Sequence, residues 1–264
     1  MRRIERTVPE IAADSAFGIA CGVSEIPSEN LAELFQPEHF SAIELPAVLL
    51  ETESAPELIA KALDSFEDVQ VGTIASLPEE DLPDPLLREF AERTGRLLAG
   101  LAEAGIHTAA LDFSEKTPEE TLLRAFRPLA PALNRTGVTL LLPFALPCDD
   151  PEAPMHCIQL LRRSMIPQLK VRLDLHLAAL PPVAPRDLAG TLLQEVRSVF
   201  LRWNADAGEF PRKEQLAPWL AALERNSFRG SWLAAPRSTD PFRIRTEALR
   251  FAELLHELKQ PSAQ

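Results

Sequence analysis

The sequence predicts an α/β protein, specifically a single-domain closed parallel (β/α)8 barrel, or TIM barrel. Apolar, β-favouring runs recur about eight times, with stretches of helical spacing between them. After the first two runs, successive starts lie roughly 30 to 40 residues apart, which is the size of one strand-helix unit. The chain has 264 residues, and barrels of this kind typically need roughly 250. Alternating strands and helices at this length favour a parallel barrel with its helices outside.

The expected strands and helices can be followed in order along the chain. The strands begin near Phe17, Phe40, Val69, Thr108, Val138, Leu169, Val199 and Arg229. Two capping-box patterns, at 54–57 and 117–120, indicate helix starts, each with a proline in the first turn where its missing N–H costs nothing. Gly105 and Gly137 follow the helical patterns 86–104 and 119–136, as C-terminal caps do.

These elements predict one domain over residues 17–258, with tails at 1–16 and 259–264. The hydrophobic content of 46% and charged content of 25% are ordinary for a globular protein with a sizeable core. The three cysteines are odd in number and widely spaced, which fits a reducing compartment better than a disulfide framework. No window reaches the roughly 20 apolar residues needed to span a bilayer. We therefore expect a cytoplasmic protein.

The charge balance limits the kinds of partner. Lysine and arginine number 27 against 39 acidic residues, giving a net charge of -12. A surface of this sign repels phosphate backbones and anionic membranes, and no basic cluster compensates for it. We expect neither nucleic acid nor a membrane as a partner, and a small polar molecule as ligand. Whether the chain forms a homo-oligomer is left open.

The sixth expected strand carries the most informative pattern. The segment 171–177 alternates apolar and ionisable residues without a break, so a β-strand there places Arg172, Asp174 and His176 on one face. In a closed barrel that face points into the interior. Polar groups are costly there unless they bind a ligand or one another.

The same alternation places further polar residues on the inward face of neighbouring strands. Glu44 lies on the second strand, Asp112 on the fourth, and Arg202, Asn204 and Asp206 on the seventh. The fifth strand is apolar throughout, and Leu140 and Leu142 are expected to point inward. Barrel enzymes keep their active sites at the C-terminal ends of the strands. We therefore predict catalytic roles for Asp174, His176, Glu44 and Asp112, and substrate binding by Arg172, Arg202, Asn204 and Asp206.

In these strands the chain resembles the xylose isomerase-like barrels, a superfamily that includes sugar isomerases and epimerases. The segment 40–45 is similar to the second strand of that family, 172–176 to its sixth and 199–206 to its seventh. The similarity in strand order covers roughly residues 17–258. The resemblance implies isomerase or epimerase activity on a small sugar. It also implies a divalent ion, held by Glu, Asp, His and Glu, that polarises a carbonyl while carboxylates move the proton.

Several of the implied metal ligands are missing from this chain. The fifth strand, 139–146, and the eighth, 230–236, should each supply a Glu, yet neither contains a carboxylate. On strand six the usual Asp-x-x-His is shortened to Asp174-x-His176, and Arg202 or Asn204 stands where strand seven should supply a His. A cationic Arg in that position opposes a divalent cation. We therefore expect a degenerate metal site, assign no metal ligand and expect no cofactor, with binding at an altered site left open.

Three functions are compatible with these residues. The first is a metal-independent or atypical isomerase, epimerase or lyase, in which carboxylates and His176 move protons and an arginine holds an oxyanion or carboxylate. Arginines in the pocket would suit an acidic sugar or a keto acid. The second is an inactive barrel that binds a small ligand or a protein. The charged residues of the interior could equally form an ion-pair network with a purely structural role. The third, an endonuclease of the same superfamily, needs a three-metal ligand set and a basic surface that this chain lacks. Whether the chain is an enzyme is thus uncertain.

Overall fold

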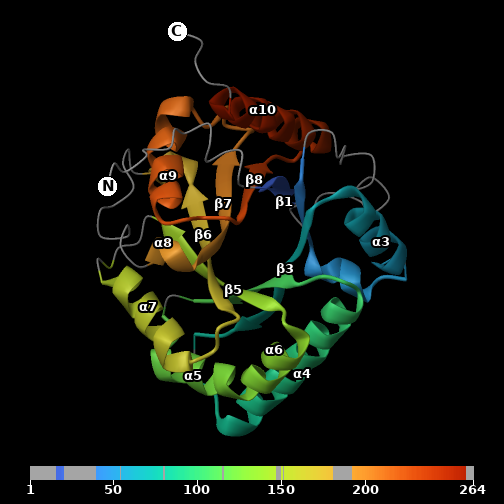
Figure 1. Cartoon of the computed structure of the whole chain (residues 1–264), viewed down its shortest axis with the longest axis vertical. Helices are drawn as coiled ribbons and strands as arrows, with labels where there is room; N and C mark the ends of the chain where they lie inside the picture. Colours follow the sequence, from blue (N-terminus) through green and yellow to red (C-terminus); the bar gives the residue numbers. More distant parts are fainter. Residues whose placement is uncertain are drawn as a thin grey trace, which may run out of the picture.

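Eight parallel strands form a closed ring in chain order, with the last strand paired to the first. This is seen in a computed structural model, which describes residues 16–20, 40–53, 55–79, 81–114, 116–146, 150, 152–180 and 192–259. Figure 1 shows the strands as the inner layer and the helices around them. The predicted (β/α)8 barrel is confirmed. Apart from Ala16 and Lys259, the predicted tails lie outside the described residues.

The strands begin close to the predicted positions. The largest difference is three residues, at the seventh strand, which begins at Val196 rather than Val199. The strands are β1 (Ala16–Ala20), β2 (Ala42–Leu45), β3 (Asp68–Leu77), β4 (Thr108–Phe113), β5 (Thr139–Leu146), β6 (Leu169–His176), β7 (Val196–Asn204) and β8 (Ser231–Arg237).

Helices cover the outside of the ring, and none of those described is long and apolar enough to cross a lipid bilayer. The longer helices are α3 (Ala55–Ser65), α4 (Asp84–Glu103), α5 (Glu119–Phe126), α6 (Ala130–Thr136), α7 (Ala153–Ser164), α9 (Lys213–Arg225) and α10 (Pro241–Lys259). Short helical segments are η1 (Ala47–Glu51), η2 (Arg127–Leu129), η3 (Leu177–Ala179) and α8 (Leu192–Glu195).

Two details of the helix prediction are corrected. The pattern 119–136 is divided into α5, η2 and α6, because Pro128 and Pro131 lack the N–H that a continuous helix needs. The capping box at Thr117 is also wrong. Its hydroxyl donates to the Pro78 carbonyl at 3.1 Å, and α5 begins at Glu119 without a side-chain cap. The Gly137 cap is confirmed, since this residue has φ 69° and donates its N–H to the Leu133 carbonyl.

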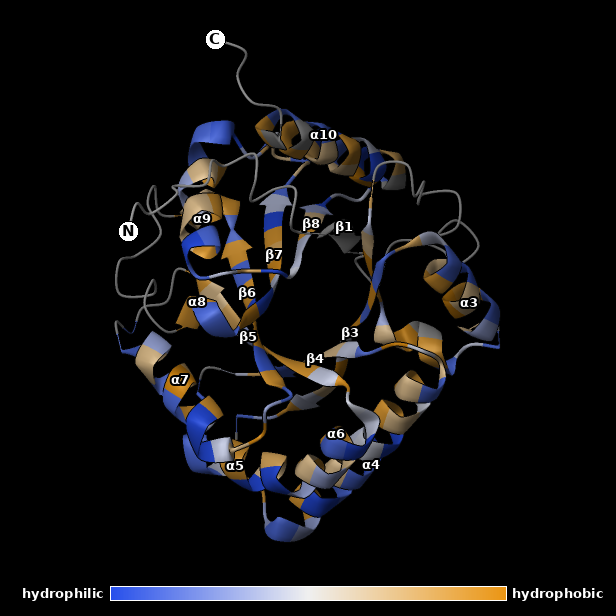
Figure 2. Cartoon of the chain, viewed as in Figure 1, coloured by the Kyte–Doolittle hydropathy of each residue, from blue (hydrophilic) through white to orange (hydrophobic). Residues whose placement is uncertain are grey.

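The main core lies between the outward face of the strands and the helices. Trp203 shows the arrangement, since its ring lies 5.6 Å from that of Phe251 and 6.1 Å from that of Phe210. In Figure 2 the strands and the helices both carry hydrophobic and hydrophilic residues, and hydrophilic bands are visible on β6 and β7. A second, small cluster of Ala42, Phe200 and Leu233 lies apart from this core and is formed by inward-facing residues.

The inward face of β5 differs from the prediction. Leu141 is paired with Lys170, Pro143 with Arg172, and Ala145 with Asp174. Paired residues on neighbouring strands share a face of the sheet, so these three β5 residues point inward. Leu140 and Leu142 instead belong to the main core outside the ring. The inner wall beside Arg172 and Asp174 is therefore built from a proline and an alanine.

Candidate functional site

Four charged side chains meet inside the barrel, and we call Glu44, Arg172, Asp174 and Arg202 the barrel charge cluster. Glu44, Asp174 and Arg202 lie in the C-terminal parts of β2, β6 and β7, and Arg172 lies near the middle of β6. Glu44, Arg172 and Asp174 are only 6%, 4% and 6% exposed, while Arg202 is partly exposed. The alternation on β6 therefore placed its ionisable residues on the inward face as predicted.

Asp174 is the acceptor at the centre of the cluster. Its Oδ1 accepts from Arg172 Nε at 2.9 Å, and its Oδ2 accepts from Arg172 Nη2 at 3.4 Å and from Arg202 Nη2 at 3.2 Å. Both guanidinium groups also lie over the Phe200 ring, at 5.1 Å for Arg172 and 4.6 Å for Arg202. Such cation–π contacts stabilise a positive charge away from water. The cluster is thus held by charge-assisted hydrogen bonds and one aromatic face.

Glu44 also pairs with Arg172, but it has fewer polar contacts than Asp174, and on average they are longer. Its Oε2 is 3.7 Å from Arg172 Nη1, which is an ion pair without a hydrogen bond, and accepts a long bond of 3.4 Å from Gln70 Nε2. Gly72 leaves room beside it, because a Cβ there would lie 3.2 Å from Oε1. Burial raises the pKa of Glu44, and the attraction of Arg172 does not offset this loss of hydration.

Arg172 keeps its positive charge inside the barrel. Burial alone would lower its pKa, but Glu44, Asp174 and the more distant Asp112 raise it. A buried guanidinium between two carboxylates is a permanent internal cation. The cluster can therefore stabilise negative charge on a ligand without further ions.

His176 and Asp112 lie at the rim of the barrel and are exposed. Burial and the charges of Arg202 and Arg237 lower the pKa of His176, against the opposing effect of Asp174. A neutral imidazole can accept a proton near pH 7, and the imidazolium so formed can return it. The structure thus brings both predicted residues near the cluster without joining them to it by hydrogen bonds.

Asn204 and Asp206 are engaged elsewhere. Asn204 Oδ1 accepts from the Ala207 N–H at 3.1 Å within the turn after β7. Asp206 accepts from the Ser238 hydroxyl at 2.7 Å and the Thr239 N–H at 3.0 Å. These bonds tie the loop after β7 to the loop after β8. Substrate binding by these two residues stays a prediction.

Sequence reasoning missed three residues that complete the site. The side-chain amide of Gln70 donates to Glu44 and, at 3.3 Å, to Ser198 Oγ. The ring of Phe200 contacts both guanidinium groups of the cluster. Gln70 shares the strand parity of Gly72, so the alternation on β3 could have revealed it. Phe200 shares the face of Arg202, but as an apolar residue it gave no such signal. Arg237 is the last residue of β8, and the sequence of this strand has no clear alternation of apolar and polar residues that could have revealed it.

The donor set does not fit the divalent ion that the family resemblance implies. Both Asp174 oxygens accept hydrogen bonds from arginine side chains. Glu44 Oε2 lies 3.7 Å from Nη1 of Arg172. Across the described part of the chain, no three His, Cys, Asp or Glu side chains are placed to hold a metal ion. A hard cation would have to displace two cationic side chains from its own ligands.

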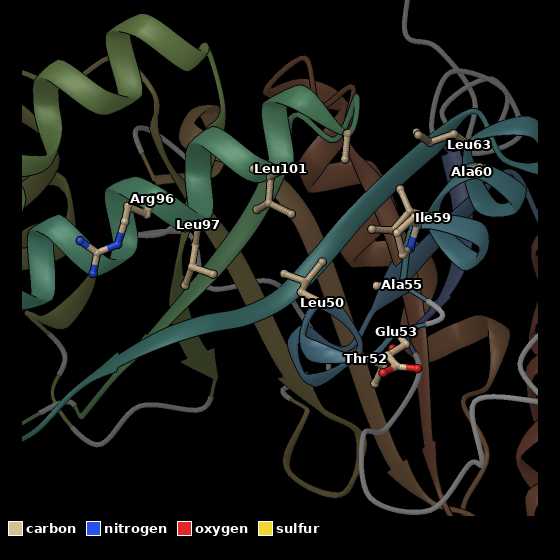
Figure 3. Close-up of a pocket in the computed structure, with 13 residues that line it drawn as sticks. Leu50, Thr52, Glu53, Ala55, Ile59, Ala60, Leu63, Arg96, Leu97 and Leu101 are labelled. Carbon is tan, nitrogen blue, oxygen red and sulfur yellow. The ribbon is translucent and has the colours of Figure 1, made fainter.

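A separate cavity of about 650 Å³ lies outside the barrel wall, between η1, α3 and α4. Its wall is largely apolar and includes Leu50, Ile59, Leu97 and Leu101 (Figure 3). Its charged lining residues are a single carboxylate, Glu53, and a single guanidinium, Arg96, without a second carboxylate or a histidine, so we place the chemistry in the barrel interior.

Comparison with known proteins identifies the type of barrel. No protein-family model and no curated protein matches the chain. Among solved structures, D-psicose 3-epimerase from Clostridium cellulolyticum H10 is similar, with a TM-score of 0.70, 16% identity and coverage of 93% of this chain and 100% of that one. L-ribulose 3-epimerase has a TM-score of 0.65 and 13% identity, covering 95% of this chain and 99% of its own.

A xylose isomerase domain-containing protein from Salmonella typhimurium LT2 has a TM-score of 0.64 and 17% identity, covering 92% and 98% of the two chains. Together with the closed ring and its charged interior, these matches define a parallel (β/α)8 barrel with a polar centre. More specifically, the chain has the xylose isomerase-like TIM-barrel fold.

The raised pKa of Glu44 predicts how stability changes with pH. Its folded-state pKa lies above the ordinary 4.5, so the folded protein binds the proton more tightly than the unfolded chain. As pH rises from 4.5 through the folded-state pKa, ionisation of Glu44 therefore costs stability. Relative to a Glu44→Gln variant, wild type should become less stable across this range, with no change below it.

The measurement is the difference in unfolding free energy between the two proteins from about pH 4 to pH 8. Glu92→Gln, on the exposed side of α4, is the matched control and should show no such trend. A Glu44→Gln difference that is independent of pH, or that favours wild type as pH rises, would contradict the assignment.

Proposed function

We propose that the chain is an isomerase- or epimerase-like barrel that acts on a small sugar or sugar acid in its interior, by acid/base chemistry without a divalent metal. One observation carries the proposal: two buried carboxylates, Glu44 and Asp174, share the buried guanidinium of Arg172 near the C-terminal ends of their strands. The solved structures of similar fold include several sugar 3-epimerases, which supports a sugar-like ligand.

The arrangement supports proton transfer next to a carbonyl. One group takes the proton from the carbon beside the carbonyl, and the electron pair moves onto the carbonyl oxygen. A guanidinium donates hydrogen bonds to that oxygen, as preorganised donors do in other enzymes. A second group then returns a proton to carbon. Glu44, whose raised pKa keeps it protonated to higher pH, is suited to donate, with Asp174, Asp112 or His176 as its partner.

The test is exchange of carbon-bound hydrogen with solvent. Ketohexoses, ketopentoses and keto sugar acids are incubated with the protein in D2O plus a chelator, and deuterium beside the carbonyl is followed by NMR. We expect exchange with at least one of these, lowered by about 100-fold or more in Glu44→Gln and Asp174→Asn. Glu92→Gln should retain the wild-type rate. Exchange unaffected by both site variants, or none with any carbonyl sugar, would overturn the catalytic proposal.

An inactive ligand-binding barrel is the second candidate. It is favoured by the saturation of Asp174, because a carboxylate whose oxygens already accept from two arginines is a weakened base. Binding of a sugar or sugar acid without deuterium exchange would support it. A cytoplasmic location and the lack of nucleic-acid and membrane partners stay predictions.

A further inference from the structure

Three neighbouring strands carry a basic side chain at or near their C-terminal ends, on the same side of the barrel mouth. His176 ends β6 and is paired with Arg202 on β7, which is paired with Ala235 on β8. Arg237 lies two residues beyond Ala235 and therefore shares its inward face. The ends of β6, β7 and β8 thus present His176, Arg202 and Arg237 together.

These positive charges are only partly compensated. The side chain of Arg202 makes one hydrogen bond to a described residue. It goes to Asp174 Oδ2, which also accepts from Arg172, and Arg202 Nε is buried without an acceptor. The backbone carbonyl of Arg237 accepts from the Ala205 N–H, but its side chain makes neither a hydrogen bond nor an ion pair with the described residues. A buried donor without an acceptor costs free energy that a ligand acceptor would recover.

Nearby carboxylates are occupied by other partners. Asp206 accepts from Ser238 and Thr239 and lies 3.7 Å from Arg243. Glu209 accepts from the Asn204 N–H at 2.7 Å. The lowered pKa of His176, caused by burial and then by Arg202 and Arg237, also indicates a positive potential here. This potential occurs in a chain whose net charge is -12.

We propose that Arg202, Arg237 and His176 form a carboxylate-binding subsite, so that the ligand of this barrel is a small sugar acid or keto acid rather than a neutral sugar. The inference rests on the proposed function and specifies its substrate class. The planar guanidinium matches the planar carboxylate. A dianionic phosphate would bring a second negative charge towards Asp174, whereas a monoanion balances the partly paired arginines. With the carboxylate held at the mouth, the rest of the ligand reaches Glu44 and Asp174.

The test compares sugar acids with neutral partners of the same shape. Dissociation constants are measured by calorimetry or NMR for glucuronate and glucose, galacturonate and galactose, and gluconate and glucitol. We expect the acid of at least one pair to bind about tenfold or more tightly than its neutral partner, the effect of one charged hydrogen bond. Arg202→Gln and Arg237→Gln should each weaken acid binding about tenfold, and each should weaken binding of the acid more than binding of its neutral partner.

Two controls keep the outcomes distinct. Arg135→Gln, on exposed α6 away from the mouth, should bind like wild type. Arg237 is exposed, so its variant remains informative if Arg202→Gln folds poorly. Neutral sugars that bind as tightly as acids, with both site variants unaffected, would overturn the subsite and leave the proposed function standing. Failure of every acid and every neutral sugar to bind would overturn both.

Discussion

Replacing Gly230 with alanine should destabilise the barrel by about 3 kcal/mol, because the added methyl collides with backbone that has no room to move. Gly230 immediately precedes β8, next to the first pair of residues that joins β8 to β7. A Cβ there would overlap the carbonyl group of Arg197 and lie 2.8 Å from Phe228 Cε2. Relief would require β7 and β8 to separate at the start of their pairing.

Gly100→Ala is the matched control for this change. Gly100 lies in α4, and a Cβ there would meet no atom within 4 Å. Alanine also restricts the unfolded chain, so we expect a stabilisation of about 0.5 to 1 kcal/mol. Denaturant unfolding of both variants measures the contrast. A Gly230→Ala protein within about 1 kcal/mol of wild type would show that β7 and β8 can adjust.

Much of the fold could be predicted because strands and helices differ in period. The uninterrupted alternation of β6 identified Arg172 and Asp174 as inward-facing and buried, as the structure shows. β5 carries no such signal, since an entirely apolar strand fits either parity, and its inward face was predicted wrongly. Register with β6, a tertiary property, decides which β5 residues point inward.

The site was only partly predictable, for two physical reasons. Strand parity applies only within the strand, and β7 ends at Asn204, so Asp206 follows the geometry of a turn instead. Contacts between distant strands are the second reason. Gln70 donates to Ser198 across 128 residues of sequence, and Phe200 supports two arginines through its ring. No local pattern shows which residues such contacts join.

Replacing Arg172 with methionine should cost about 3 to 5 kcal/mol of stability, the range for removing one partner of a buried ion pair. The change removes both hydrogen bonds from Arg172 to Asp174 and the ion pair to Glu44, while Phe200 loses one of its two cations. Asp174 would retain only Arg202, and Glu44 would lose the charge that opposes its burial.

Arg163→Met is the matched control, since Arg163 also pairs with two carboxylates, Glu119 at 2.6 Å and Glu120 at 2.5 Å, but at the surface. Water already solvates those groups, so we expect a loss of about 0 to 1 kcal/mol. A double variant, Arg172→Met with Asp174→Asn, should recover part of the loss by removing the unpaired charge. If Arg172→Met instead costs no more than Arg163→Met, the barrel charge cluster does not hold the barrel together, and its charges are free to act on a ligand alone.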